Sequence, residues 1–309
     1  MEKKNGNSKE QAVAFLDLLA FSNNVRENME DAMSAIEHYN TILHTKLLNE
    51  AVYTRKPPVP ALEDIANERR IFSFDNFLPF SDSVFISATD PNLFLKQIGS
   101  FILNCFQLTS RNYQQPLDVR RPFVVKVGGS ESSWYPTLFR GGIAWGEVYP
   151  LNLISIIDRQ SQMIRNLAGK AVVTAVGLEQ KVKGPRIVLE QNYFDLLDEP
   201  TRRYVQATEI KGIYEILWPS FLYISVNGES EITRFNELFL PAVNFWKAYN
   251  HSPYSAHYFK FIELIVDSSI KTFEGIGLTE KCVKHINEQI KNAGLETKAK
   301  ELLKAYYPL

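Results

Sequence analysis

Short apolar runs typical of strands alternate along this chain with stretches of helical spacing, and two of the short runs each hold one acid. The run AVAFLDLLAFS at 12–22 predicts a buried strand that ends in a turn, and its one charge is Asp17. The run FSDSVFIS at 80–87 predicts a hairpin with Asp82 at or near its tip. Because a buried unpaired carboxylate is costly, both acids need a partner.

The other patterns predict further helices and strands in alternation. The expected helices cover 27–50, from the Asp90 cap to about 112, and 169–183. Proline residues break the pattern and predict a surface loop over 51–68. The remaining expectations are strands at 70–74, 122–127, 138–150 and 184–190, a surface loop at 128–136, a helical or irregular stretch at 151–167, and a hairpin over 208–224 that turns at Lys211-Gly212.

This order of elements predicts an α/β (α+β) sandwich with a mostly antiparallel, ferredoxin-type sheet, rather than a doubly wound parallel sheet. From about Asn227 helical runs dominate, at 231–249, 258–273 and 279–306. We therefore expect a sheet domain over 8–225 and a helical C-terminal extension over 226–309. The extension should pack on the sheet domain or on a partner chain.

Composition excludes several classes of function. The 309 residues include 34 basic and 35 acidic ones, and a formal net charge of -1 gives no electrostatic case for nucleic acid. No apolar run approaches the ~20 residues of a membrane helix, and the polar start MEKKNGNSKEQ is unlike a signal peptide. Cys105 and Cys282 match no metal spacing, so reduced structural thiols are expected. These features predict a soluble, cytoplasmic protein.

The two acids predict a metal site if their strands are neighbours. Carboxylate oxygens suit Mg²⁺ or Mn²⁺, and two such ions can activate an attacking oxygen and stabilise a leaving phosphate. The metal ligands would be Asp17, the backbone of Leu18, and Asp82. Backbone N–H groups in the turn from Leu18 to Ser22 would face an anion. The alternative is that each acid pairs with a lysine or arginine.

Four segments together resemble the class III nucleotidyl cyclases. FLDLLAFS and FSDSVFIS resemble the two metal-binding strands of that superfamily. RGGIAWGEVY at 140–149 is similar to its R-x-G-I-x-x-G-x-V strand. GKAVVTAVGLEQKVKGPRIVLE at 169–190 is similar to G-x-x-V-N-x-A-x-R-L-E followed by P-x-R-I. The four occur in the family's order over about 8–225, which would make that segment the catalytic domain.

The chain departs from the purine cyclases of this superfamily at four positions. Leu78 stands where adenylate cyclases have a base-reading lysine, and Asn166 where they have a base-reading aspartate. Their transition-state asparagine and arginine align with Val173 and Gly177. By position alone, Leu78 and Asn166 are the expected base-binding residues.

The chain keeps the two acids expected to bind metal and lacks the residues that contact the base in purine cyclases. Together with the motifs F-S-D-S, R-G-G-I-x-x-G-E and A-x-x-L-E…P-R-I, this combination resembles the bacterial pyrimidine cyclases of the anti-phage Pycsar systems. The resemblance implies a homodimer with composite active sites and two Mn²⁺ or Mg²⁺ ions. It implies conversion of UTP, with CTP as second choice, to the 3′,5′-cyclic nucleotide and pyrophosphate. It also implies a separate effector protein that senses the cyclic product and stops growth of the infected cell.

A triphosphate needs further positive charge, since no arginine stands at position 177. We expect Lys170 and Lys181 to be catalytic cations, with a solvated surface position as the alternative for each. Lys183 and Arg186 are further candidates. The expected triphosphate-binding residues are Leu19, Ala20, Phe21, Ser22 and Arg140, the last having a pairing with a sheet acid as its alternative.

Two other functions stay open at this point. One is a conventional adenylate or guanylate cyclase whose base pocket uses other residues. The other is a non-catalytic cyclase-like module that binds nucleotide or a partner. Loss of the Asn and Arg positions favours the module, whereas retention of Asp17 and Asp82 opposes it.

Overall fold

The computed structural model of this chain describes residues 8–19, 21, 29, 33, 36, 74–110, 123–127, 130–134, 136–223, 228–250, 253–303 and 306, with the backbone alone for 123–127, 130–134 and 157. Met29, Met33 and Ile36 have helical backbone, in agreement with the helix predicted over 27–50. The rest of that helix, and the loop predicted over 51–68, lie outside the described residues.

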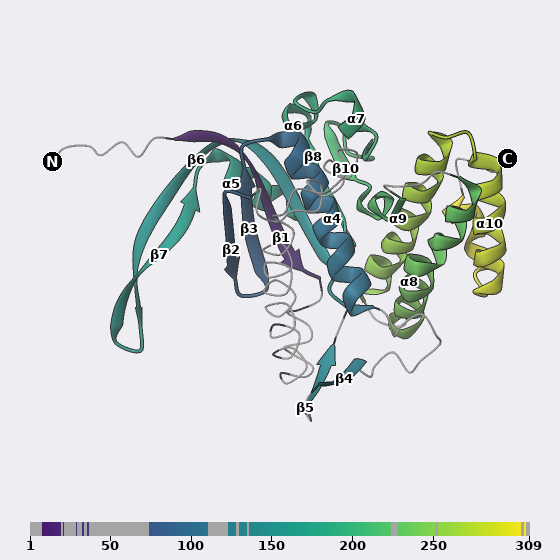
Figure 1. Cartoon of the computed structure of the whole chain (residues 1–309), viewed down its shortest axis with the longest axis horizontal. Coiled ribbons are helices and arrows are strands. Elements are labelled where there is room, and N and C mark those ends of the chain that lie inside the picture. Colours follow the sequence, from purple (N-terminus) through teal and green to yellow (C-terminus); the bar gives the residue numbers. More distant parts are fainter. Residues whose placement is uncertain are drawn as a thin grey trace, which may run out of the picture.

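An eight-stranded sheet organises the part of the chain that the structure describes (Figure 1). Its strand order is β2-β3-β1-β6-β8-β10-β9, with β7 paired to β6 beside this path. The β6–β8 pair is parallel and the other described pairs are antiparallel. The predicted α/β fold with a mostly antiparallel sheet is confirmed. The bounds are β1 Lys9–Leu18, β2 Asn76–Phe80, β3 Ser83–Ala88, β6 Phe139–Ile157, β7 Gln160–Ala168, β8 Ile187–Glu190, β9 Val205–Ala207 and β10 Ile213–Ile216.

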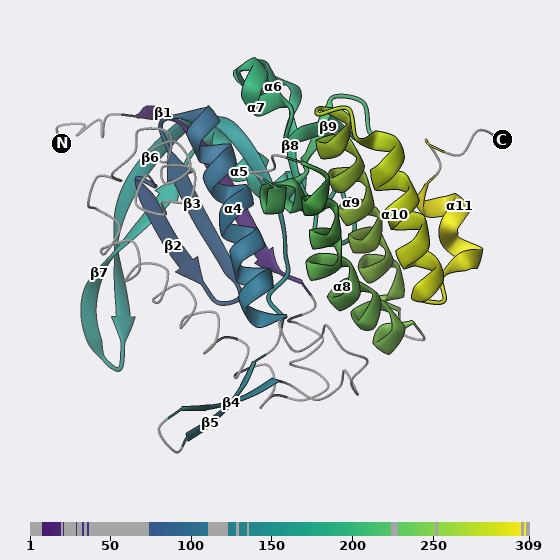
Figure 2. The ribbon, with the colours of Figure 1, turned by 45° about the vertical axis from the view of Figure 1, so that its right-hand side comes forward.

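The two faces of β1 pack against different helices. Alternate residues of β1, from Ala12 to Leu18, join the large core that includes α4 (Pro91–Thr109), which crosses the sheet in Figure 2. Val13 and Phe15 point to the opposite face, which α5 (Lys170–Glu179) covers. Asp17 shares the α5 face because side chains of a strand alternate with a period of two. As predicted, Asp90 caps α4 by accepting from the N–H groups of Asn92 and Leu93.

Helix α5 lies directly on the backbone of β6 at Gly142. A Cβ atom at Gly142 would stand 2.3 Å from the carbonyl oxygen of Ala175 and 2.5 Å from Cβ of Leu178. Gly142→Ala is therefore expected to destabilise the fold by about 1–3 kcal/mol. In the control Gly177→Ala, nothing lies within 4 Å of the new Cβ, and a stabilisation of about 0.5–1 kcal/mol is expected on an exposed helix face. Urea unfolding measures both changes, and equal effects would contradict this packing.

The structure corrects the prediction for 151–167. This segment is not helical: β6 runs on to Ile157 and pairs with β7 in a long hairpin that projects from the body in Figure 1. Asp158 (φ 49°) and Arg159 (φ 66°) form its two-residue turn, which suits the twist of a hairpin. Apolar residues occupy both faces of this hairpin, so the period-two alternation that identifies a strand is missing. We call the paired residues 149–168 the arm.

Three smaller predictions also change. The predicted strand at 122–127 is β4 (Phe123–Val127), but the predicted loop at 128–136 contains β5 (Ser130–Trp134), which pairs with β4. The hairpin predicted over 208–224 is formed by β9 and β10, so it begins earlier, at Val205, and ends at Ile216, because Trp218–Tyr223 form the 3₁₀ helix η3. Of the strand at 70–74, only Phe74 is described, and it is not in a strand. Two short helices, α6 (Gln191–Asp195) and α7 (Glu199–Arg202), were not predicted.

The C-terminal extension is helical, as predicted. It consists of η4 (Glu229–Phe235), α8 (Asn236–Tyr249), α9 (Ser255–Glu274), α10 (Thr279–Asn292), η5 (Glu296–Lys298) and α11 (Ala299–Leu302). Its buried side chains belong to the same core as those of α4 and β1. At the junction, Trp218 stacks on Phe261 of α9, with ring centroids 5.4 Å apart, and donates to the carbonyl oxygen of Pro185 at 2.9 Å. The extension thus packs on the sheet domain of its own chain.

Two further expectations can be compared with the structure. Cys105 and Cys282 are free and buried, in agreement with structural thiols. Among the helices described, none combines the length and the apolar character that crossing a bilayer requires.

Candidate active site

A row of four residues in register crosses the α5 face of the sheet at the ends of four strands. Phe80 lies opposite Ser83, Ser83 opposite Asp17, and Asp17 opposite Arg140. Residues directly opposite in antiparallel pairs project to the same face, so their side chains meet. The local sequence produces this row because the acids end or follow strands whose apolar residues set the register.

Both carboxylate oxygens of Asp17 have partners in the structure. The Ser83 hydroxyl lies 2.8 Å from Oδ1, where it donates a hydrogen bond. The Arg140 guanidinium donates to Oδ2 from Nε and Nη2, each at 3.1 Å. The pairing with an arginine, one of the two alternatives that the sequence left open for Asp17, is thus present in the structure.

Asp82 follows Ser81, which has a φ of 55°, in the tight turn between β2 and β3. The carbonyl oxygen of Asp82 accepts from the N–H of Leu18 at 3.0 Å, which ties the hairpin tip to the end of β1. Burial, and then the nearby charge of Asp17, raise the pKa of Asp82, against hydrogen bonds from its own backbone and Ser81. The two acids are therefore close enough to repel each other, and a bound cation would relieve that repulsion.

Glu179, the last residue of α5, is a third acid that the sequence analysis missed. Its side chain is buried and forms an ion pair with Nε of Arg140. Burial raises the pKa of Glu179, whereas the charge of Arg140 lowers it. A signal was present in the sequence: Glu179 falls on the same helical face as Ala171 and Ala175, which are buried apolar residues of α5.

Arg140 thus lies between Asp17 and Glu179, with Asp82 nearby. Three carboxylates around one guanidinium leave an excess of negative charge when all are ionised. Asp17 and Asp82 supply carboxylate oxygens, which are the ligands that a hard divalent cation such as Mg²⁺ or Mn²⁺ prefers. Among the described residues no group of three or more His, Cys, Asp or Glu side chains has an arrangement that would hold a metal ion. Two aspartates leave coordination positions open for phosphate oxygens.

The predicted triphosphate cradle is revised by the backbone hydrogen bonds. The N–H of Leu18 donates to Asp82 and that of Leu19 to Leu138, so neither N–H faces an anion. Phe21 is buried, and Ala20 and Ser22 lie outside the described residues. Arg140 is therefore the predicted triphosphate residue that the structure brings to the acids.

The two predicted catalytic lysines lie at opposite ends of α5. Lys181 is exposed and follows Glu179 by two residues, so it lies at the end of α5 near Arg140. Lys170 is exposed at the first residue of α5, about 13 Å along the helix axis from Glu179. Val173 and Gly177 lie on the exposed side of the same helix. Lys170 and the acids of its own chain are thus not brought together.

The two predicted base-binding residues are also separated. Leu78 lies opposite Phe85, whose ring centroid is 4.9 Å from that of Phe15, one row from the acids on the same face. Asn166 lies on the exposed arm opposite Leu151, roughly 35 Å of strand beyond Arg140, and accepts from the N–H of Leu167. Within one chain, Leu78 is near the acids and Asn166 is not.

Comparison with known proteins finds similar solved structures alone. No protein-family model and no curated protein sequence matches the chain. The guanylyl cyclase Cya2 is 13% identical, with 69% of this chain and 93% of that chain covered and a TM-score of 0.40. The adenylyl cyclase CyaB from P. aeruginosa is 16% identical, with 73% and 97% covered and a TM-score of 0.39. The guanylate cyclase domain of RhGC from Catenaria anguillulae, in complex with GTP, is 15% identical, with 67% and 96% covered and a TM-score of 0.41.

Proposed function

We propose that this protein is a nucleotide cyclase that converts UTP, with CTP as second choice, to the 3′,5′-cyclic nucleotide and pyrophosphate. The observation that carries the proposal is the cluster of Asp17, Asp82 and Glu179 around Arg140. It combines acids for divalent cations with one guanidinium for phosphate. The motif order found in the sequence supports the same activity.

In the proposed reaction the ribose 3′-oxygen attacks the α-phosphorus of the same molecule. The O3′–P bond forms, the bond from the α-phosphorus to the bridging oxygen of the β-phosphate breaks, and the 3′-hydroxyl proton leaves to solvent. Asp17 and Asp82 would hold two divalent cations, which lower the cost of a 3′-alkoxide and neutralise the triphosphate. Arg140 would bind the phosphates, and Glu179 would keep its guanidinium at the site. Lys181, at the same end of α5, would add positive charge.

Selection of a pyrimidine base is supported by Leu78. Its apolar side chain lies beside Phe15 and Phe85 on the face that carries Asp17. A leucine cannot form the hydrogen bond to a purine base that a lysine forms, so this position lacks the contact that would favour a purine. Asn166 would have to reach a site on another copy of the chain to contact the base.

A product assay with all four nucleoside triphosphates tests the activity and its base specificity. With Mn²⁺ and equimolar ATP, GTP, CTP and UTP, purified protein is expected to consume UTP, or CTP, and to yield the matching cyclic nucleotide, measured by liquid chromatography with mass spectrometry. Cyclic AMP or cyclic GMP as the main product would contradict pyrimidine specificity and support a conventional adenylate or guanylate cyclase. Tight Mn²⁺-dependent binding of UTP without formation of a product would contradict the enzyme activity and support a non-catalytic nucleotide-binding module.

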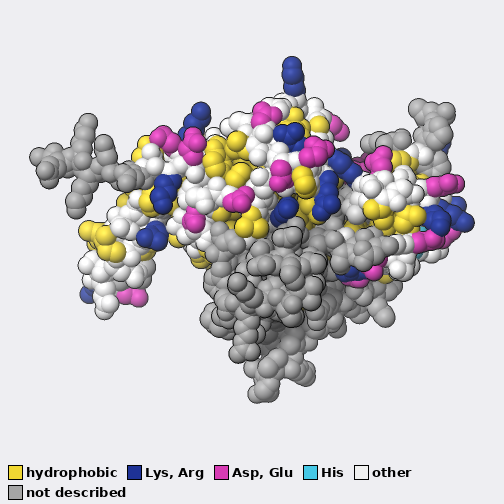
Figure 3. All heavy atoms as spheres, turned by 45° about the horizontal axis from the view of Figure 1, so that its top comes forward, with side chains coloured by type: hydrophobic (Ala, Val, Ile, Leu, Met, Phe, Trp, Pro, Cys, Tyr) yellow, Lys and Arg dark blue, Asp and Glu magenta, His cyan; other side chains and the backbone are white. Residues whose placement is uncertain are grey.

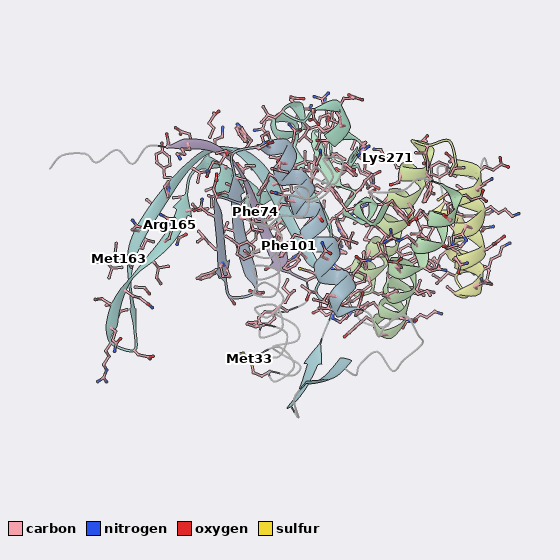
Figure 4. The ribbon with its side chains drawn as sticks, in the orientation of Figure 1. Met33, Phe74, Phe101, Met163, Arg165 and Lys271 are labelled. Atoms are coloured by element: carbon pink, nitrogen blue, oxygen red, sulfur yellow. The ribbon has the colours of Figure 1, made fainter. Side chains whose placement is uncertain are left out.

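A homodimer with composite sites is part of the proposal, and the arm supports it. Ile154 lies opposite Met163 on one face of the arm and Leu153 opposite Ile164 on the other, and all four are at least 40% exposed. Figure 3 shows such apolar patches on the arm, and Figure 4 shows Met163 on this hairpin, away from the body. A two-stranded hairpin is marginally stable alone, and exposed apolar area of this kind marks an interaction site.

The proposed biological role is anti-phage defence through a second messenger. It rests on the motif resemblance to the Pycsar cyclases, whose cyclic product a separate effector protein senses. Cells that carry the protein are expected to accumulate the cyclic pyrimidine nucleotide after phage infection, as measured by mass spectrometry of extracts. Equal amounts in infected and uninfected cells would contradict this role.

A further inference from the structure

The first turn of α9 contacts the segment that follows α5. The backbone N–H of Gly184 donates to Nδ1 of His257 at 3.0 Å, across 73 residues of sequence. Gly184 has a φ of 84°, and a Cβ there would lie 2.9 Å from the carbonyl oxygen of His257 and from Cβ of Lys260. The C-terminal extension therefore contacts the backbone of Gly184 directly, with no side chain in between.

The segment 184–186 is in turn joined to the strand that carries Arg140. The carbonyl oxygen of Arg186 accepts from the N–H of Gly141 at 3.0 Å, one residue after Arg140. The other end of the same connection is Glu179, which pairs with Arg140. Asp17 on β1 holds the Arg140 guanidinium from one side. The backbone next to Arg140 and its second acidic partner, Glu179, both belong to or contact the connection that includes Gly184, the residue that His257 contacts.

We propose that His257 is a positioning residue of the active site, and that the C-terminal extension is thereby a working part of the catalytic unit. By accepting from Gly184, His257 holds the connection from Glu179 to Arg186 in place, and with it the guanidinium of Arg140. The proposal rests on the proposed cyclase function for its kinetic consequence. Its structural consequence, protection of the Gly184 N–H, is independent of the reaction.

The charges around His257 agree with an accepting, neutral imidazole. Burial, and then the positive charges of Arg140 and Lys183, lower the pKa of His257. Lys260, paired with Glu263, and the ring of Tyr254 are the groups of α9 and its N-cap nearest to this contact. An imidazole that accepts at Nδ1 carries its proton on Nε2. Protonation at acidic pH would convert Nδ1 into a donor and end the hydrogen bond.

The sign of the pH effect follows from the direction of this pKa. The folded pKa of His257 lies below that of an unfolded histidine, about 6.5. Its contribution to stability is therefore complete above pH 6.5 and is lost as the pH falls through the folded pKa. Farther along α9, burial raises the pKa of Asp267 to about 6. Protonation of Asp267 therefore increases the stability of the fold as the pH falls, which is opposite to the effect of His257.

Two variants of His257 separate the hydrogen bond from packing. His257→Ala removes the acceptor, and His257→Asn keeps an acceptor oxygen near the position of Nδ1 without titrating near neutral pH. With Mn²⁺ and the nucleotide that wild type consumes, His257→Ala is expected to lose about tenfold or more in kcat with little change in KM. His257→Asn is expected to stay within about threefold of wild type and to lose less activity than wild type as the pH falls below about 6.5. The control His285→Ala removes a half-buried histidine of α10, and its kcat should not change.

Hydrogen exchange of the peptide covering 180–187 is measured on the same proteins. Faster exchange in His257→Ala, restored in His257→Asn, is expected. The proposal is overturned if His257→Ala keeps the wild-type kcat, or if His257→Asn is as impaired as His257→Ala. If wild type turns over no nucleotide, the cyclase function fails by itself. The exchange result then decides the positioning role, and unchanged exchange in His257→Ala overturns it.

Discussion

Asp82→Asn is expected to lower nucleotide turnover by at least about 10³-fold while leaving the fold at least as stable as wild type. The substitution keeps the shape of the side chain and removes the charge that would bind a divalent cation. The hydrogen bond from Leu18 to residue 82 uses the backbone carbonyl, so the link between the hairpin tip and β1 is retained. Turnover with Mn²⁺, and the melting temperature from circular dichroism, measure the two effects.

Stability is expected to rise in this variant at neutral pH because of the direction of the pKa shift. Burial and Asp17 raise the pKa of Asp82, so the ionised form is disfavoured in the folded state. The folded protein therefore gains stability as the pH falls through that pKa, and Asp82→Asn should have this gain at pH 7 already. Asp195→Asn, an exposed acid on α6, is the matched control, with turnover like that of wild type.

Mn²⁺ affinity of the nucleotide-free protein adds a readout that does not depend on turnover. Electron paramagnetic resonance is expected to show weaker Mn²⁺ binding in Asp82→Asn than in Asp195→Asn. Wild-type turnover in Asp82→Asn would contradict the assignment of this acid as a metal ligand. Lost turnover with a much lower melting temperature would instead indicate a role in folding.

Charge on the arm is expected to separate the proposed dimer and reduce turnover by about 100-fold or more, since each composite site would lack half of its residues. The double variant Ile154→Glu, Met163→Glu places two carboxylates opposite each other on one exposed face. A carboxylate desolvated in an apolar interface without a partner is costly. Sedimentation velocity measures the mass in solution, and the product assay measures turnover.

Ile276→Glu is the matched control for the arm, because Ile276 is 48% exposed between α9 and α10, on the extension rather than on the arm. The control should keep the mass and turnover of wild type. An arm variant that stays dimeric and active would contradict the arm as the interface. A wild-type protein that is monomeric and active would contradict the composite site itself.

The elements that carry Asp17 and Asp82 were predictable from local pattern. Each acid stands in or beside an apolar run of strand length, and the polar turn before Ser83 identified the hairpin. The Asp90 cap and the helices of the extension were predictable for the same reason, since caps and 3.6-residue periods are properties of neighbouring residues. The arm was not, because a hairpin with apolar residues on both faces has no period-two signal.

The chemistry of the site depends on contacts that no local pattern contains. Arg140 and Asp17 are 123 residues apart, and the register of β1 with β6 brings them together. The sequence predicted that the N–H groups of Leu18 and Leu19 would bind phosphate, but in the structure they donate to the carbonyl oxygens of Asp82 and Leu138. Glu179 faces the site because α5 packs against Gly142, a close approach that needs a glycine on β6.

The sequence by itself thus identifies Asp17 and Asp82 as acids that need a partner. It also identifies the strands, the hairpin and the helices around them. Which groups become their neighbours is decided by the assembled sheet and by the packing of helices on it. Side-chain period and turn chemistry act over a few residues. Hydrogen bonds and ion pairs need their partners within a few ångströms. The contacts of Arg140 and of His257 therefore form only when strands and helices that are distant in the chain pack together.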